Sequence, residues 1–253
     1  MNSLVALLHA ESIKLRRSLI LGLALLFPLG LLVVSTLALA LIVKPGEGAS
    51  WKGWIIVSLI PWASFLLPML ACLLATLLLN LEHQNHQWKH LNALPVSRWK
   101  HLAAKQVALG LLLLLAHLLL LAGFMLGGWA MNLARPSLHL GAPNLSQACG
   151  LVGLLFLASW AMAGAHTWLA SRFSHLGVNL GLGMVGIALI AVVSQRPALA
   201  RCLPWAMPMM GLTDWMGGPE AAPLWTASGL SVILGTLLLV LACWDAQKRE
   251  TAG

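Results

Sequence analysis

Residues 106–134 read QVALGLLLLLAHLLLLAGFMLGGWAMNLA and contain no aspartate, glutamate, lysine or arginine. Roughly 20 apolar residues in a helix are enough to cross a bilayer, so this stretch predicts a membrane span. A second uncharged stretch, residues 53–81, precedes it. The polar residues 82–105 between the two, called the island below, are therefore expected to form a loop between two spans.

The composition of the whole chain is typical of a membrane protein. Hydrophobic residues make up 60% and charged residues 9%, whereas about a quarter of the residues in soluble domains are charged. Apolar segments occur at about 18–43, 54–81, 102–132, 148–170, 176–195 and 224–243, and only the third contains a charged residue, Lys105 near its start. Because lipid requires the backbone groups to be paired within a segment, we expect an all-α membrane protein with six transmembrane helices. The expected organisation is a single transmembrane domain, residues 1–253.

Basic residues orient these spans, because lysine and arginine accumulate on the cytoplasmic side of a membrane. Ten of them fall on one set of segments: Lys14, Arg16, Arg17, Lys89, Arg98, Lys100, Lys105, Arg172, Lys248 and Arg249. Five fall on the other: Lys44, Lys52, Arg135, Arg196 and Arg201. We expect both termini and the island in the cytoplasm, with the chain in the cell (inner) membrane. The net charge of +8 then reflects this bias and not the binding of a nucleic acid.

The segment before the first span, residues 1–18, has helical periodicity. Its leucines Leu4, Leu8 and Leu15 share one face, on which Glu11 also falls. Its basic residues are Lys14, Arg16 and Arg17. Two interpretations stay open: an interfacial helix along the inner membrane surface, or a cytoplasmic extension of the first span. A cleaved signal peptide is disfavoured, because the apolar run exceeds the usual length of about 7–15 residues.

Prolines and glycines mark places where the spans are expected to bend or to approach one another. Pro28, Pro61 and Pro68 predict kinks or local unwinding. Gly177 and Gly181 have the GxxxG spacing that permits close helix packing, either within one subunit or across a dimer.

The sequence lacks the motifs of several enzyme and carrier classes. It contains no GxxxxGK[ST] phosphate loop, so ATP binding by that route is excluded. It also contains no GxSxG elbow and no HExxH helix, which argues against an intramembrane hydrolase. No Asp, Glu, Lys or Arg lies deep in a predicted span, which argues against an ion-coupled carrier. His117 and His166 do lie well inside spans, and we favour neutral rings hydrogen-bonded to a neighbouring helix over a transport role. We predict no catalytic residue and no cofactor in this chain.

The longest outer loop, residues 196–223, is unusually apolar. We expect it to pack on the spans or to dip into the outer leaflet, because water-exposed loops are seldom this apolar. Its methionines are Met207, Met209, Met210 and Met216, and copper binding by their thioethers is less favoured than packing. A bridge between Cys149 and Cys202 near the outer face is conceivable, but we expect unpaired cysteines.

Three histidines of the island, His83, His86 and His90, repeat along one face of a short helix. Zinc uses ligands at such spacing, but Glu82 alone is available to complete the set. We predict no metal site there.

Beside these histidines, Trp88, Leu91 and Leu94 form an apolar stripe that Pro95 ends. Ser97 is expected to be the N-cap of the helix that follows. The pattern predicts a short cytoplasmic helix within residues 82–100. Its stripe either packs against the chain's own helix ends or docks into a partner's groove, and the spacing does not decide between them.

Two stretches carry a family resemblance. The first is Glu11-Ser-Ile-Lys-Leu-Arg-Arg-Ser18, followed by an apolar run with Pro28. The second runs from Glu82 through Trp88-Lys-His-Leu-Asn-Ala-Leu-Pro95-Val-Ser-Arg98 to Lys105. In these stretches and in its six-span layout the chain resembles the type-2 ABC permeases, in particular the branch serving lantibiotic self-immunity and bacitracin-type resistance.

The resemblance implies a permease subunit without ATPase activity, paired with a second copy or a sister permease and served by separate cytoplasmic ATPase subunits that bind ATP and Mg²⁺. The island would carry the coupling helix that sits in the ATPase groove, and the outer loop would cap the exit side. The matching coupling residues are Glu82, Trp88, Leu91, Leu94, Pro95 and Arg98. The matching residues of the interfacial helix, in contact with membrane lipid, are Glu11, Lys14, Arg16 and Arg17.

These observations suggest an ATP-driven exporter of a hydrophobic or amphipathic molecule, such as an antimicrobial peptide. The alternative is a membrane scaffold or sensor subunit that binds a cytoplasmic regulatory partner and transports nothing. A third hypothesis, an enzyme, requires His117 and His166 to face one cavity with a nucleophile such as Ser159.

Overall fold

The structure is a computed structural model that describes residues 3–15, 18–43, 50–84, 97–173, 175–217, 221–223 and 225–251. All regular secondary structure in these ranges is helical, which confirms the predicted all-α class. The elements are α1 (Ser3–Leu15), α2 (Leu19–Ile42), α3 (Trp51–Pro61), the π-helix η1 (Trp62–Leu66), α4 (Leu67–Gln84), α6 (Arg98–Ala134), the 3-10 helix η2 (Pro136–Leu138), α7 (Leu145–Ala158), α8 (Trp160–Arg172), α9 (Leu176–Val193), α10 (Pro197–Ala200), α11 (Met207–Met216) and α12 (Thr226–Thr251).

Six helical segments are long and apolar enough to cross a membrane, which confirms the prediction of six spans. They are Leu19–Ile42, Trp51–Leu81, Arg98–Ala134, Leu145–Arg172, Leu176–Val193 and Thr226–Lys248. The third, α6, has 37 residues. At about 1.5 Å per residue it is about 55 Å long, well beyond the roughly 30 Å of the hydrocarbon core, so α6 extends beyond the apolar layer.

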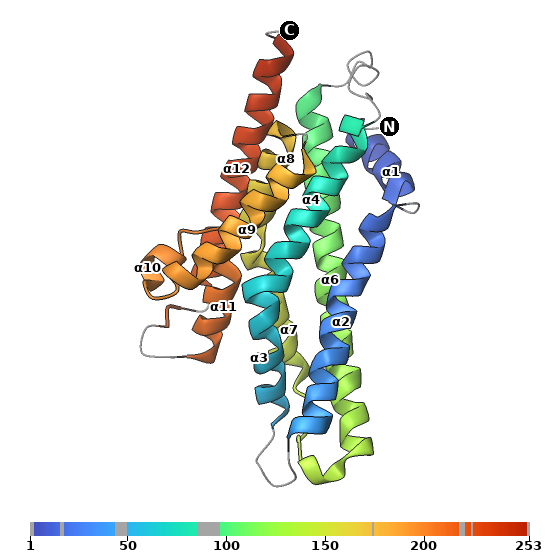
Figure 1. The fold of residues 1–253 in the computed structure, drawn as a ribbon, viewed down its shortest axis with the longest axis vertical. Helices are drawn as coiled ribbons and strands as arrows, with labels where there is room; N and C mark the ends of the chain where they lie inside the picture. The colour runs from blue at the N-terminus through green and yellow to red at the C-terminus, as the bar shows by residue number, and fades with distance from the viewer. Residues whose placement is uncertain are drawn as a thin grey trace.

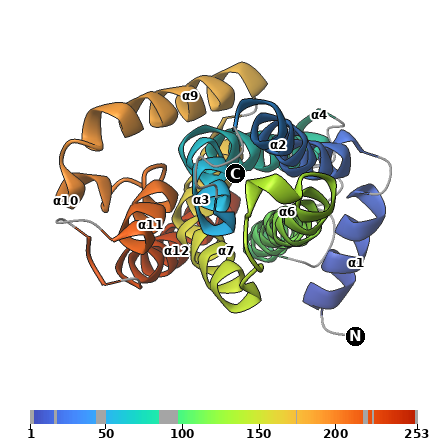
Figure 2. The ribbon, with the colours of Figure 1, turned by 90° about the horizontal axis from the view of Figure 1, so that it is seen from below.

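The ends of the helices form two groups along the long axis of the molecule (Figure 1). α1, the end of α4, the start of α6 and the C-terminal end of α12 lie at one end, whereas α2 ends and α3 begins at the other. α1 lies beside α6 at the edge of the bundle (Figure 2). The N-terminal helix, both flanks of the island and the C-terminus therefore share one side, as the predicted topology requires. That this side faces the cytoplasm remains a prediction.

The N-terminal segment forms a helix of its own. α1 ends at Leu15, and Ser18 has extended backbone angles (φ −117°, ψ 156°) before α2 begins. The Ser18 hydroxyl donates to the Leu15 carbonyl at 3.0 Å. The interpretation of this segment as a simple extension of the first span is therefore wrong, and its location at the membrane surface remains a prediction.

The second span is interrupted where its prolines predict. α3 ends at Pro61, η1 follows, and α4 begins one residue before Pro68. Proline donates no backbone hydrogen bond and its ring clashes with the preceding turn, and a wider π turn accommodates both effects. Trp62 is fully buried in this turn. Pro28, in contrast, lies inside a continuous α2.

A close approach between helices occurs at glycines other than the predicted pair. A Cβ atom on Gly164 would lie 2.7 Å from the Gly235 carbonyl oxygen, so α8 and α12 pack backbone against backbone. At Gly177 and Gly181 a Cβ atom would meet nothing within 4 Å. The GxxxG pair therefore makes no such contact within the described chain, and its use across a dimer remains a prediction.

The outer loop, residues 196–223, folds back onto the spans, as predicted. Its helix α11 packs against α7 and α12, and Met207 and Met210 are buried there. Asp214 of α11, whose side chain is inaccessible to solvent, accepts a hydrogen bond from Arg201 at 2.8 Å. Packing therefore accounts for these two methionines.

Candidate functional site

Most of the predicted coupling residues lie outside the described part of the chain. They are Trp88, Leu91, Leu94 and Pro95, together with the side chain of Glu82. Of the three island histidines, His86, His90 and the side chain of His83 also lie outside it. Glu82 belongs to α4 by its backbone, and Arg98 opens α6. Ser97 occupies the N-cap position of α6, as predicted, but its side chain makes no capping hydrogen bond.

A cluster of charged side chains lies where α1 packs against the end of α4 and the start of α6. Lys105 Nζ on α6 donates to the Leu78 carbonyl oxygen of α4 at 2.8 Å and to the two carboxylate oxygens of Glu11 on α1 at 3.4 and 3.5 Å. Lys14 Nζ contacts the same carboxylate at 3.0 Å. We call Glu11, Lys14, Lys105 and the Leu78 carbonyl the charged junction. It connects three helices that are far apart in the sequence.

The central pair of the charged junction is shielded from solvent. Lys105 is 2% exposed and Glu11 is 5% exposed. An unpaired buried charge is costly, whereas a paired and hydrogen-bonded one is tolerated. Helical spacing explains the position of Lys105, because it shares one face of α6 with the buried Leu102 and Leu109.

Sequence reasoning located these residues without finding their contact. Lys105 reads as the basic edge of the island, and Glu11 reads as a flaw in an amphipathic face. One feature of the sequence indicates that Glu11 has a partner: it falls on the same helix face as three leucines. A buried carboxylate on an apolar face needs a cationic partner. Of the other interfacial candidates, Lys14 belongs to the charged junction, and Arg16 and Arg17 lie outside the described residues.

Two further polar contacts connect neighbouring helices. Thr167 of α8 donates to Gln106 Oε1 of α6 at 2.6 Å, and both side chains are buried. Arg172 at the end of α8 pairs with Asp245 of α12 at 2.6 Å, with the arginine side chain 46% exposed. Together with the charged junction, these separate contacts connect α1 to α6, α6 to α8, and α8 to α12.

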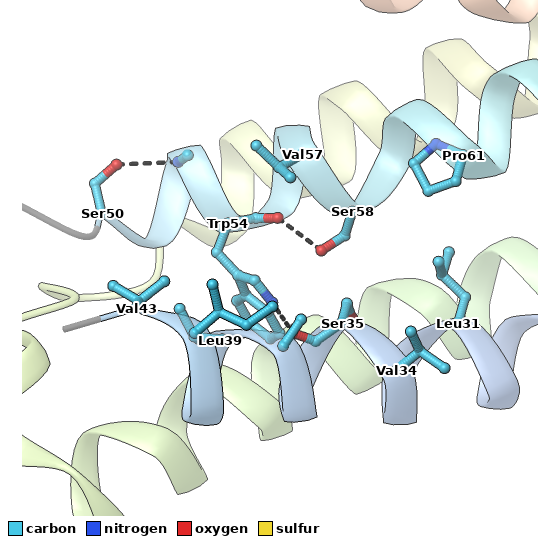
Figure 3. A pocket seen from close by; sticks show the side chains of 13 residues that line it. Leu31, Val34, Ser35, Leu39, Val43, Ser50, Trp54, Val57, Ser58 and Pro61 are labelled. Atoms are coloured by element: carbon cyan, nitrogen blue, oxygen red, sulfur yellow. Dashed lines mark hydrogen bonds between the residues drawn. The ribbon is translucent and has the colours of Figure 1, made fainter.

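An apolar pocket of about 590 Å³ lies between α2 and α3 (Figure 3). The ends of these two helices lie at the end of the molecule away from α1 (Figure 1). The walls of the pocket include Leu31 and Val34 from α2 and Val57 and Pro61 from α3. This volume falls within the range of roughly 300–1,000 Å³ that is typical of small-molecule sites. We call this space the apolar pocket.

The hydroxyl groups in the apolar pocket are engaged with the backbone. Ser58 donates to the Trp54 carbonyl at 2.7 Å, and Ser35 donates to the Leu32 carbonyl at 3.2 Å. Ser50 accepts a hydrogen bond from the Gly53 N–H at 3.0 Å. No charged side chain belongs to the described lining. The pocket therefore suits the apolar part of a ligand.

Trp54 forms a fixed wall of the apolar pocket and links it to α6. Its Nε1 donates to the Ser35 carbonyl at 3.3 Å, which ties α3 to α2 (Figure 3). Its ring meets Phe124 of α6 edge-on, with 5.5 Å between the centroids. A Cβ atom on Gly127 of α6 would lie 3.0 Å from the same indole. The shape of the pocket thus depends on the position of α6.

The two membrane histidines occupy different surroundings. Trp205, in the turn before α11, donates to His166 Nε2 at 3.0 Å. The predicted hydrogen bond of His166 to another part of the chain is present, but the partner lies in a turn and not in a helix. The His117 ring bonds instead to the Leu113 carbonyl of its own helix at 2.7 Å. The prediction is therefore wrong for the partner of His117. Ser159, the nucleophile of the enzyme hypothesis, donates to the Phe156 carbonyl at 2.7 Å.

The histidines and cysteines of the chain are possible metal ligands or disulfide partners. Among the described residues, no group of three or more His, Cys, Asp or Glu side chains is placed to hold a metal ion. Cys149 and Cys202 are unpaired and exposed, as predicted.

Comparison with protein families gives one match. The model of a family described as "ABC-2 family transporter protein" matches residues 7–194, which is more than half of the chain and includes most of α1, the island and the apolar pocket. A search of curated proteins finds no match.

Proposed function

Because the chain belongs to the ABC-2 family of transporter proteins, we propose that it is the membrane-spanning permease subunit of an ATP-driven exporter. The chain has no phosphate loop, so ATP and Mg²⁺ would bind to separate cytoplasmic ATPase subunits. In this proposal the island faces the cytoplasm of a cell with the protein in its inner membrane. The apolar stripe of Trp88, Leu91 and Leu94, ended by Pro95, is then the ATPase contact.

The observation that carries this proposal is the course of α6. This helix begins at Arg98, on the flank of the island, and continues without interruption to Ala134. Phe124 and Gly127, in its second half, hold the Trp54 indole that forms a wall of the apolar pocket. A displacement of the island therefore has a direct structural route to the pocket, which is what coupling of ATP hydrolysis to transport requires.

The apolar pocket supports a hydrophobic or amphipathic cargo. Its hydroxyls are engaged with the backbone and its described lining carries no charge, so a charged headgroup gains nothing there. The pocket lies between two segments that are long and apolar enough to cross a membrane, which favours a molecule taken from the bilayer. An antimicrobial peptide of the lantibiotic or bacitracin type fits this requirement, because it presents apolar side chains to the membrane.

A second permease, either another copy or a sister chain, completes the proposed transporter. The exposed apolar face of α9 supports this part, since Val178, Val185 and Val192 have no cover within the described chain. Gly177 and Gly181 lie on the same helix without a neighbour within 4 Å. The alternative of a scaffold or sensor subunit requires no pocket, and the presence of one favours transport.

Co-purification tests the proposal. Affinity-purified chain is expected to retain an ATPase subunit, and Trp88→Ala with Leu91→Ala is expected to release it. Trp129→Ala with Leu133→Ala is the matched control, since these exposed residues lie near the far end of α6. The proposal fails if no ATPase accompanies the wild-type chain, or if the island variant keeps its transport-coupled ATP hydrolysis.

A further inference from the structure

We propose that Lys105 is a positioning residue which, through Glu11, makes α1 move together with the two helices that flank the island. This inference rests on the proposed function, because it concerns how motion at the ATPase contact reaches the rest of the permease. It goes beyond that function in assigning α1 a mechanical role that depends on one buried ion pair.

The first support is the place of the charged junction relative to the island. Leu78 lies six residues before the end of α4 at Gln84, and Lys105 lies seven residues after the start of α6 at Arg98. At about 1.5 Å per residue, the junction is about 10 Å along each helix from the segment that joins α4 to α6. Lys105 therefore joins the two flanks of the island close to their ends.

The second support is the way in which α1 is attached. α1 ends at Leu15, and the chain is extended at Ser18 before the first span begins. Because the helix is interrupted between α1 and α2, the backbone does not couple their motion rigidly. α1 instead packs on α6, and Glu11 of α1 contacts Lys105 inside that interface.

The third support is the chemistry of the pair. Apolar side chains of similar size can replace a buried ion pair without loss of stability, so stability alone does not explain a lysine at 2% exposure. The charged pair adds a defined geometry that apolar side chains would not impose. Lys105 Nζ has to contact the Glu11 carboxylate and the Leu78 carbonyl at the same time. This double requirement fixes α1 in rotation and in height against α4 and α6.

Distance measurements between spin labels test this assignment. Labels at Ser12 of α1 and Val107 of α6, both exposed, are placed in a chain whose four native cysteines are replaced by alanine. The complex with its ATPase is measured without nucleotide and after trapping with ATP and vanadate. We expect one narrow distance that is the same in both states, because α1 and α6 move as one unit.

Lys105→Met removes the charge while keeping a long apolar side chain. We expect a broadened Ser12–Val107 distance that shifts on trapping, with the ATPase still co-purified because the apolar stripe of Trp88, Leu91 and Leu94 is unchanged. Lys105→Arg is expected to restore the narrow distance. If Lys105→Met does not fold, Glu11→Gln serves the same purpose, because it removes the opposite charge with almost no change in size.

Two results would overturn the inference: a wild-type distance that changes on trapping, or a neutral variant with the wild-type distance in both states. Failure of the proposed function is separate from either result. It would appear as the absence of a co-purified ATPase, whereas the nucleotide-free distance still reports whether Lys105 holds α1.

Discussion

The charged junction and the hydroxyls of the apolar pocket use hydrogen bonds in opposite ways. In the charged junction, the side chains of Lys105 and Glu11 are buried and bind one another across separate helices. In the apolar pocket, the hydroxyls of Ser35 and Ser58 bind the backbone of their own helices. The first arrangement fixes helices relative to one another, and the second leaves an apolar space between helices. Side chains that bind across helices, such as Lys105 and Glu11, hold the bundle together. Hydroxyls that bind their own helix leave the space between α2 and α3 open to an apolar ligand.

Removing one side of the charged junction should have the largest effect on stability. Glu11→Ala leaves Lys105 buried beside the Leu78 carbonyl, and breaking a buried pair costs about 3–5 kcal/mol. We expect the free energy of unfolding, from a denaturant titration in mixed micelles, to fall by about 3 kcal/mol.

Arg172→Ala is the control for that change. The Arg172 side chain is 46% exposed, and a pair of this kind contributes about 0–1 kcal/mol. If Glu11→Ala and Arg172→Ala lowered the free energy of unfolding by similar amounts, burial would not explain the contribution of the charged junction.

Filling the apolar pocket should weaken cargo binding. Val57 lines the pocket and is 67% exposed, so Val57→Trp occupies the space without crowding the core. We expect a labelled bacitracin-type peptide to bind about tenfold more weakly in a fluorescence titration, a loss of about 1.4 kcal/mol. Val240→Trp on the exposed face of α12 should bind it like the wild type. Equal affinity in both variants would place the ligand elsewhere.

Loosening the wall of the apolar pocket should have a smaller effect. Trp54→Phe keeps an aromatic ring against Phe124 but removes the hydrogen bond from Nε1 to the Ser35 carbonyl. Loss of one such bond costs about 1 kcal/mol of unfolding free energy, which the same titration can resolve. Trp129→Phe, at a position 62% exposed, should cost less. A greater loss at Trp129 would contradict the assignment of Trp54 as a fixed wall.

The smallest effect is expected from Ser58→Ala. The Ser58 hydroxyl donates to the Trp54 carbonyl one turn earlier in its own helix, so it is not available to a ligand. We expect unchanged peptide affinity and a stability change below about 0.5 kcal/mol. A marked loss of affinity would mean that the hydroxyl faces the cargo, and the pocket would then be less apolar than its geometry indicates.

The features predicted from the sequence are those that depend on local pattern. The six spans follow from uncharged runs of sufficient length, and the break after Pro61 follows from the missing backbone donor of proline. The N-cap position of Ser97 was also predictable from its place before an apolar run. Each of these depends on residues within one or two turns of one another.

The features missed by sequence reasoning depend on contacts between distant segments. Glu11 and Lys105 are 94 residues apart in the chain, and no local pattern pairs them. The contact between Gly164 and Gly235 requires knowing that α8 and α12 are neighbours. The apolar pocket arises from the way in which α2 and α3 separate around Trp54, which hydropathy does not encode.

The central claim is that α6 connects the ATPase contact at the island to the apolar pocket. Spin labels at Val34 and Val57, exposed residues on opposite walls of the pocket, measure its width in the complex without nucleotide and after vanadate trapping. We predict a different width in the two states for the wild type, and one unchanged width for Trp88→Ala with Leu91→Ala. A wild-type pocket of the same width in both states would contradict the claim.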